Sequence, residues 1–266
     1  MLCGNDQLDE EYKQHKVFLR LDEYIHFYNR LSDSIMHFIT VGTTSIINLD
    51  TYVYSSLSAT LESIKMVLWD GKINDAFTLL RKYYDSSMIN IYTNLYLSEN
   101  FTLKNLVVEQ VNNWLHGKQQ LPEYRIMSRY IKESPKLLLI TKLLSIDDRY
   151  KNVRNLCNDH THWNFFKNFL TNDKNIYSEN RIIHLNNFNF CLQELFIQHM
   201  AYLFYLNNHY MLSSDYMDYV ECGEIPPDEA QYWVAPFIQE MFDKEIKTHR
   251  NDIFNEIKNN TQMQLT

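Results

Sequence analysis

Long stretches of this sequence run without glycine or proline, the residues that most often interrupt regular structure. Only five of each occur among 266 residues, too few to supply the turns of a many-stranded β protein. Apolar residues make up 45 % of the chain, which is enough to bury a sizeable core. These features predict an all-α fold, a multi-helix bundle with helical extensions at both ends.

The clearest helices are predicted between Asp50 and about Leu97. In the first, apolar residues recur every three or four positions, a spacing that places them on one helical face. The sequence Trp69-Asp70-Gly71 should end this helix, because glycine adopts the left-handed conformation of a helix C-terminus. Asn74 or Asp75 can cap the second helix. Two helices joined by so short a turn predict an antiparallel αα-hairpin.

Further helices are expected along most of the remaining chain. They should cover 103–115, 124–132, 136–144, a segment that begins after Asp147 or Asp148, and 182–210. The aromatic residues Trp163, Phe165, Phe166 and Phe169 are expected to continue an apolar face. A loop near Gly42 and a loop over 213–229 divide the chain into an N-terminal extension (1–48), a bundle (49–212) and a C-terminal loop and helix (213–266).

The charge and the cysteines restrict the function classes. A chain that coats nucleic acid would usually be basic, whereas the net charge here is −8, so any contact with RNA must be local. Cys3, Cys157, Cys191 and Cys222 are far apart, as expected of reduced thiols. The longest apolar run, Met200 to Leu206, is far short of the ~20 residues needed to span a bilayer. We expect a cytoplasmic protein with no membrane partner.

One short segment is rich in chemically capable groups. Arg154 offers a permanent charge and donors that match phosphate, and His160 can exchange a proton near neutral pH. Together they could cleave RNA through the ribose 2′-hydroxyl without a metal or cofactor. On a straight helix, however, six residues span ~9 Å and point the side chains ~240° apart. Either the helix breaks near Asn158-Asp159, or a second copy of the chain completes the site.

The pattern Arg154-Asn155-x4-His160 resembles the signature of HEPN-domain ribonucleases, an arginine followed by a polar residue and then a histidine. The resemblance covers residues from about 50 to 210. It includes the earlier helix at 75–81, since a similar helix is common in HEPN domains. It implies a HEPN-like helical core and a metal-independent endoribonuclease that works as a homodimer, as in many toxins and phage-defence proteins. Arg154 and His160 would be the catalytic pair and Asn155 would orient them. Asp159 and His162 could support the site.

Purely structural interpretations remain open for the same residues. Arg154 can be a surface arginine and His160 a hydrogen-bonded cap histidine, in a non-catalytic all-α module that dimerises or binds a protein through its C-terminal helix. Catalysis requires both side chains to be exposed in a shared cleft, whereas the module allows them to be buried or splayed apart.

Three further groups have alternative interpretations. Cys157, His160 and His162 form a weaker candidate for a metal site, with no fourth ligand. Arg81 and Asp85 are expected to form a surface ion pair or to line the cleft. His199 is expected to be a core histidine whose polar atoms are hydrogen-bonded.

Overall fold

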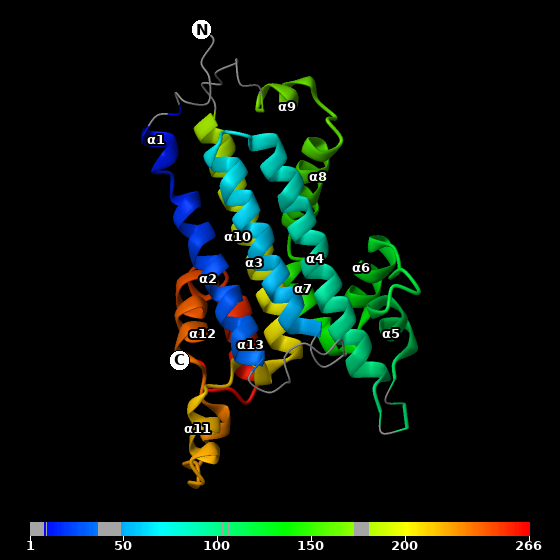
Figure 1. Ribbon diagram of the computed structural model, residues 1–266, viewed down its shortest axis with the longest axis vertical. Coiled ribbons are helices and arrows are strands. Elements are labelled where there is room, and N and C mark those ends of the chain that lie inside the picture. The colour runs from blue at the N-terminus through cyan, green and yellow to red at the C-terminus, as the bar shows by residue number, and fades with distance from the viewer. Residues whose placement is uncertain (1–7, 9, 37–48, 103, 106, 173–180) are drawn as a thin grey trace. The chain divides into compact units, whose positions relative to one another are not determined.

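The computed structural model describes residues 8, 10–36, 49–102, 104–105, 107–172 and 181–266 (Figure 1). Nearly all of these residues lie in helices or in the turns between them, and within these ranges two isolated bridges occur but no strand. The predicted all-α bundle is therefore confirmed. The loop expected near Gly42 lies outside the described residues.

Four α-helices are much longer than the others, with 21 to 28 residues each. They are α2 (Lys16–Met36), α3 (Leu49–Trp69), α4 (Ile73–Asn100) and α10 (Arg181–Leu206). The shorter α-helices are α1 (Glu10–Lys13), α5 (Glu109–Leu115), α6 (Tyr124–Glu133), α7 (Leu138–Leu144), α8 (Arg149–Thr161), α9 (Phe166–Leu170), α11 (Asp215–Glu221), α12 (Pro236–Met241) and α13 (Asn251–Asn260). Short 3-10 turns lie at η3 (Pro135–Leu137), η4 (Asn208–Met211) and η5 (Ala230–Tyr232), and a π-helical segment, η6 (Phe242–Lys247), follows α12.

The predicted hairpin is α3 followed by α4. Gly71 has a φ of 77°, and its amide donates to the Leu68 carbonyl at 2.8 Å, so glycine ends α3 as expected. Two predictions were less accurate. Helix α5 begins only at Glu109, because Thr102 and Asn105 bond to each other's backbone in a tight turn instead of to helical partners. The predicted loop over 213–229 contains α11.

The chain forms two compact units that are interleaved in sequence. Unit 1 comprises Met1–Asn29, Val53–Ser87 and Asp148–Phe196, and unit 2 comprises Arg30–Tyr52, Met88–Asp147 and Ile197–Thr266. Because α2, α3, α4 and α10 each contribute residues to both units, neither unit is a single stretch of chain. The three-part division expected from the sequence stays a prediction.

The core of unit 1 is aromatic. The rings of Tyr24 and Phe196 stack with centroids 3.8 Å apart, and the Tyr28 and Tyr83 hydroxyls share a hydrogen bond of 2.8 Å. Phe188 is fully buried against Phe77. Aromatic rings from α2, α4 and α10 therefore form this core.

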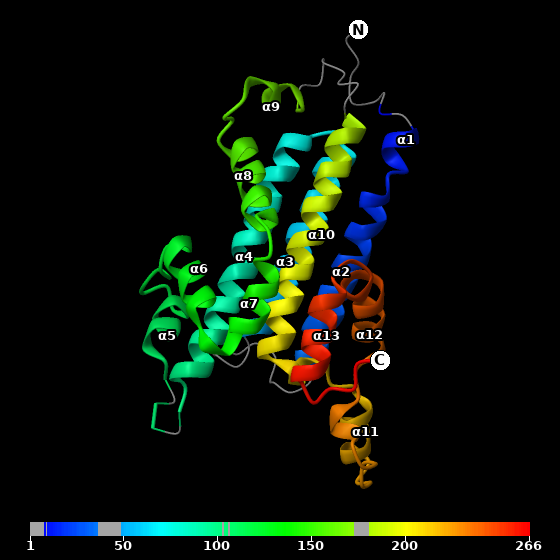
Figure 2. The same ribbon diagram turned by 180° about the vertical axis from the view of Figure 1, so that it is seen from behind.

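In unit 2 the C-terminal helix α13 packs onto α7 (Figure 2). Pro236 is the first residue of α12, a position where its missing amide hydrogen costs no helical bond, so a helix can begin there. The Arg250 guanidinium donates to the Leu143 carbonyl at 2.7 Å and to Asp252. The apolar face of α13 is buried in the chain, so a protein partner bound through that face would have to displace residues already packed there. Such a partner stays a prediction.

Candidate functional site

The residues of the arginine–histidine motif lie on α8 and at its end. Arg154, Asn155, Asp159 and His160 belong to one helix that runs through to Thr161, and His162 is its C-cap. The break considered near Asn158-Asp159 is therefore wrong. Because the helix is continuous, a separation of six residues keeps the side chains of Arg154 and His160 ~240° apart around the axis. One copy of α8 does not bring them together.

His160 is buried, with 3 % of its surface exposed. Its imidazole stacks on the Phe77 ring, with centroids 4.2 Å apart and planes 11° apart. Burial, and secondarily the nearby His184, lowers the pKa of His160 from 6.5 to about 4. The ring is therefore neutral at physiological pH. Catalysis would require an exposed His160, whereas the structure buries this residue.

Asn74 connects His160 to Trp163. This asparagine is buried in the first turn of α4, and its side chain lies 2.9 Å from His160 Nδ1. In the amide orientation that satisfies both neighbours, Asn74 donates to His160 Nδ1 and accepts from Trp163 Nε1 at 2.8 Å. His160 then accepts through Nδ1 and carries its proton on Nε2. The histidine thus fixes an asparagine that in turn fixes an exposed indole.

Helix α8 ends in a strained turn. The Asn164 amide donates to the Asp159 carbonyl at 3.0 Å and the Trp163 amide to the His160 carbonyl at 3.4 Å, the two bonds of a Schellman motif. The left-handed position of that motif, which glycine usually occupies, is taken by Trp163 with a φ of 52°. A bulky residue in this conformation costs about 1 kcal/mol or more. Contacts with neighbouring residues must therefore hold Trp163 in this conformation.

The segment after α8 has polar residues inside and aromatic residues outside. Asn168 is buried and donates its side-chain amide to the Asp159 carbonyl at 2.9 Å, and Asn164 donates to the Asp159 carboxylate at 2.8 Å. The Asn172 side chain accepts from the amides of Asn74 and Asp75 at the start of α4. The following aromatic residues are exposed instead: Trp163, Phe165, Phe166 and Phe169. The prediction that they continue a buried apolar face is wrong.

The reason is local hydrogen bonding. In this segment the asparagines supply partners for backbone groups beyond the end of α8, which need satisfaction near the core. Asn168 takes an inward position, whereas Asn164 stays exposed, and the aromatic side chains beside them are exposed as well. The sequence carried no signal of this exposure, because the apolar residues keep a helical spacing of three and four: Trp163, Phe166, Phe169 and Leu170.

The other motif residues remain accessible. Asn155 and His162 are exposed, and Arg154 and Asp159 are partly exposed. Asp159 is engaged by Asn164, as described above. None of these four side chains shares a cleft with His160 in one chain, because His160 faces Phe77.

A second polar group lies where α4 meets α8. Arg81 forms an ion pair with Asp85, as predicted, and its Nε donates to Asn158 Oδ1 at 2.9 Å. Beneath it, burial raises the pKa of the Cys157 thiol, and the charges of Arg81, Asp85 and Arg154 act on the same thiol. Arg81 and Arg154 are therefore both close enough to the Cys157 thiol to lower its pKa. Sequence reasoning considered Arg81 for a cleft but did not find Asn158 as its partner.

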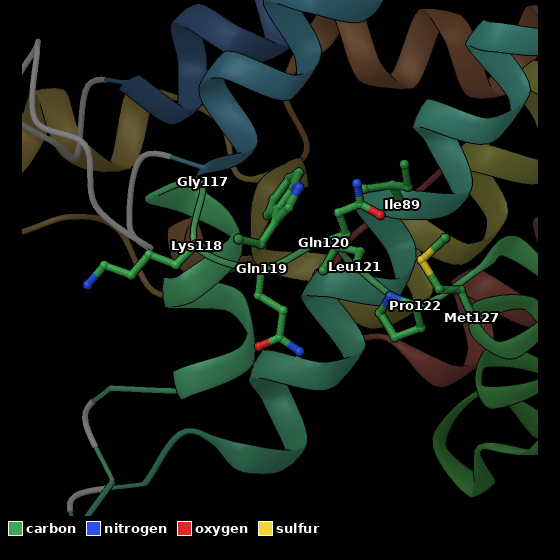
Figure 3. A pocket seen from close by; sticks show the side chains of 9 residues that line it. Ile89, Gly117, Lys118, Gln119, Gln120, Leu121, Pro122 and Met127 are labelled. Atoms are coloured by element: carbon green, nitrogen blue, oxygen red, sulfur yellow. The ribbon is translucent and has the colours of Figure 1, made fainter.

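Within the described ranges, no three His, Cys, Asp or Glu side chains are grouped so that they could hold a metal ion, and this includes Cys157, His160 and His162. A shallow cavity of about 510 Å³ lies beside α5, where Figure 3 shows Lys118 pointing away from Leu121 and Pro122. A second, of about 400 Å³, lies between α2, α11 and α12. Neither is lined by a residue of the arginine–histidine motif.

No helix among the described residues has the length and apolar character to cross a membrane. Comparison of the chain with profiles of protein families, with curated proteins and with solved structures gives no match. The geometry of the site therefore has to carry the functional argument.

Proposed function

We propose that this chain is a non-catalytic all-α interaction module. The observation that carries the proposal is the burial of His160. A general acid–base residue needs a pKa near the working pH and access to the reacting hydroxyl. His160 has neither, because it is stacked on Phe77 and its pKa is lowered to about 4. Its contacts support a structural role, in which it holds Asn74 and, through Asn74, Trp163.

The exposed aromatic residues support a role in binding another molecule. We define the aromatic turn as Trp163, Phe165, Phe166 and Phe169. If each ring buries about 200 Å² when covered, their exposed fractions leave roughly 450 Å² of aromatic surface in contact with water. Apolar patches of this size on a monomer often mark a binding surface.

RNA cleavage tests the proposal. Full-length protein is incubated with structured and single-stranded RNA in the presence of a chelator, beside the variants Arg154→Ala and His160→Gln. We expect background cleavage from all three proteins. Cleavage by the wild type that both variants lose would overturn the module and restore the arginine–histidine mechanism.

A second candidate is the metal-independent endoribonuclease predicted from the sequence, working as a homodimer. The observation in its favour is that Arg154 and Asn155 stay accessible while Arg81 and Asn158 add polar groups on the same helix pair. This candidate requires a second copy that exposes His160 and supplies it to Arg154 of the first. Light scattering that finds only monomers at assay concentration would count against it.

A further inference from the structure

The chain segment after α13 folds back onto unit 2. Residues 262–266, which we call the strap, leave the end of α13 and run to α12 (Figure 2). Two strap side chains are buried, since Met263 is 6 % exposed and Leu265 is 3 % exposed. The Gln264 side chain between them is exposed. Alternate side chains of the strap therefore face the protein, the pattern with which a bound peptide places apolar side chains in a partner.

The backbone of the strap is bound by groups from η5, α12 and η6. The Gln264 amide donates to the Tyr232 carbonyl at 2.8 Å. The Gln239 side chain bonds to both backbone groups of Thr266, donating to its oxygen at 3.3 Å and accepting from its amide at 3.1 Å. Lys247 donates to the same oxygen at 3.2 Å. A side-chain amide that pairs with a backbone in this way recognises an extended chain and not a particular side chain.

A residue with a strained backbone also contacts the strap. Glu229 has a φ of 69°, in the left-handed region that residues other than glycine rarely adopt. Its carboxylate accepts from Gln264 Nε2 at 2.7 Å. Residues held in such conformations cluster at binding sites and switch regions. Strain and strap contact coincide at Glu229, which favours a binding surface over incidental packing. We call Glu229, Tyr232, Gln239 and Lys247 the docking surface.

The strap is held less firmly than the helices on which it lies. Its bonds to the side chains of the docking surface are exposed to solvent, where water can replace either partner at little net cost. Lys247 also pairs with Asp243, so it keeps a partner when the strap leaves. The entropy lost on ordering the strap opposes the burial of its two apolar side chains. A segment bound in this way opens locally while the rest of the protein stays folded.

We propose that the docking surface binds a segment of a partner protein and that the strap occupies this surface in the free chain. The partner segment carries two apolar side chains separated by one residue, which take the places of Met263 and Leu265. Its backbone takes the bonds that Gln239 and Tyr232 make with the strap. The inference rests on the proposed interaction module and names its surface. Such a partner displaces the strap and leaves the buried face of α13 packed.

The probe is a fluorescein-labelled peptide, Thr-Gln-Met-Gln-Leu-Thr, which copies residues 261–266, and its binding to the full-length protein is measured by fluorescence anisotropy. The strap variant, Met263→Ser with Leu265→Ser, should bind the probe at least about tenfold more tightly than the wild type, because the strap no longer competes. Adding Gln239→Leu to the strap variant should weaken binding about fivefold. Adding Gln119→Leu, at an exposed glutamine beside α5, is the matched control and should change nothing. A probe with serine in place of methionine and leucine should not bind.

Thermal unfolding of each variant establishes that it folds. Gln264→Pro is a second strap variant, because it removes the amide that donates to Tyr232 without changing a buried side chain. Equal affinity of the wild type and both strap variants, no binding by folded strap variants, or equal binding of the serine probe would overturn the inference. A wild-type dimer that the strap variants lose would also overturn it and would assign the surface to the strap of a second copy. RNA cleavage that depends on Arg154 would instead overturn the module and leave the affinities for the probe standing.

Discussion

Two buried histidines of this protein each pair with an asparagine of α4, and the two pairs support different parts of the structure. In unit 1, His160 bonds to Asn74 of α4, and in unit 2, His199 Nε2 lies 2.9 Å from Asn90 Oδ1 of the same helix. Burial lowers the pKa of His160 to about 4 and that of His199 to about 3. Both rings are therefore neutral at physiological pH.

The difference lies in what each asparagine holds. Asn90 donates to the Asp50 carboxylate at 2.8 Å, and Asp50 also accepts from Asn94 and from the Tyr210 hydroxyl at 2.6 Å. Burial raises the pKa of Asp50, and these donors oppose the shift. Asn74 instead holds an indole that reaches the surface. One pairing therefore secures a core, and the other supports the aromatic turn.

The largest effect is expected from Asn90→Leu. This change removes a donor to Asp50 and the acceptor of His199, leaving buried polar groups unsatisfied. We expect the free energy of unfolding to fall by about 3 kcal/mol in urea denaturation. Asn152→Leu, at an exposed position of α8, is the control and should change it by less than about 0.5 kcal/mol. A loss as small as that of the control would mean that the network of unit 2 contributes little.

Asn74→Leu should cost less, about 2 kcal/mol by the same measurement, because the Trp163 indole is half exposed and can reach water. Its more specific effect is on the aromatic turn. Loss of the Asn74 contact should free the Trp163 indole and shift the tryptophan fluorescence emission to longer wavelength, which Asn90→Leu should not cause in folded protein. If both variants shifted the emission equally, the two pairings would not be distinct.

The pH dependence of the free energy of unfolding should reveal the contribution of His160. A histidine whose folded pKa lies below its unfolded value of 6.5 destabilises the folded state as pH falls from 6.5, and the loss levels off near pH 4. The free energy of unfolding of the wild type should therefore fall by about 3 kcal/mol more over that range than that of His160→Gln. Parallel pH curves for the two proteins would contradict the burial of His160.

The smallest effect is expected from Trp163→Gly. Glycine relieves the left-handed backbone strain by about 1 kcal/mol, while the indole bond and the contact with Phe169 are lost. The two changes should nearly cancel in thermal unfolding. A large destabilisation would mean that Trp163 serves the core more than the surface.

The helices could be predicted from the sequence because they depend on local spacing. The αα-hairpin of α3 and α4, its end at Gly71 and the satisfied core histidine His199 all follow from periodicity or from local chemistry, and the structure confirms them. The ends of α5 and the presence of α11 did not follow, since helix ends depend on competing side-chain bonds.

The environment of His160 could not be predicted for a different reason. Its burial depends on Phe77 and Asn74, which lie more than eighty residues earlier in the chain. The sequence places Arg154 and His160 on one segment but does not say which side of α8 faces α4. Exposure of the aromatic turn likewise depends on long-range bonds, such as that from Asn172 to the start of α4.

The most direct test of the account is the titration of His160 by NMR, with its ring resonances assigned by comparison with His160→Gln. The account predicts a neutral ring protonated on Nε2 at pH 7 that takes up a second proton only near pH 4. A His160 that titrates near its ordinary pKa and exchanges freely with water would contradict it, and would return this residue to the role of an acid–base catalyst.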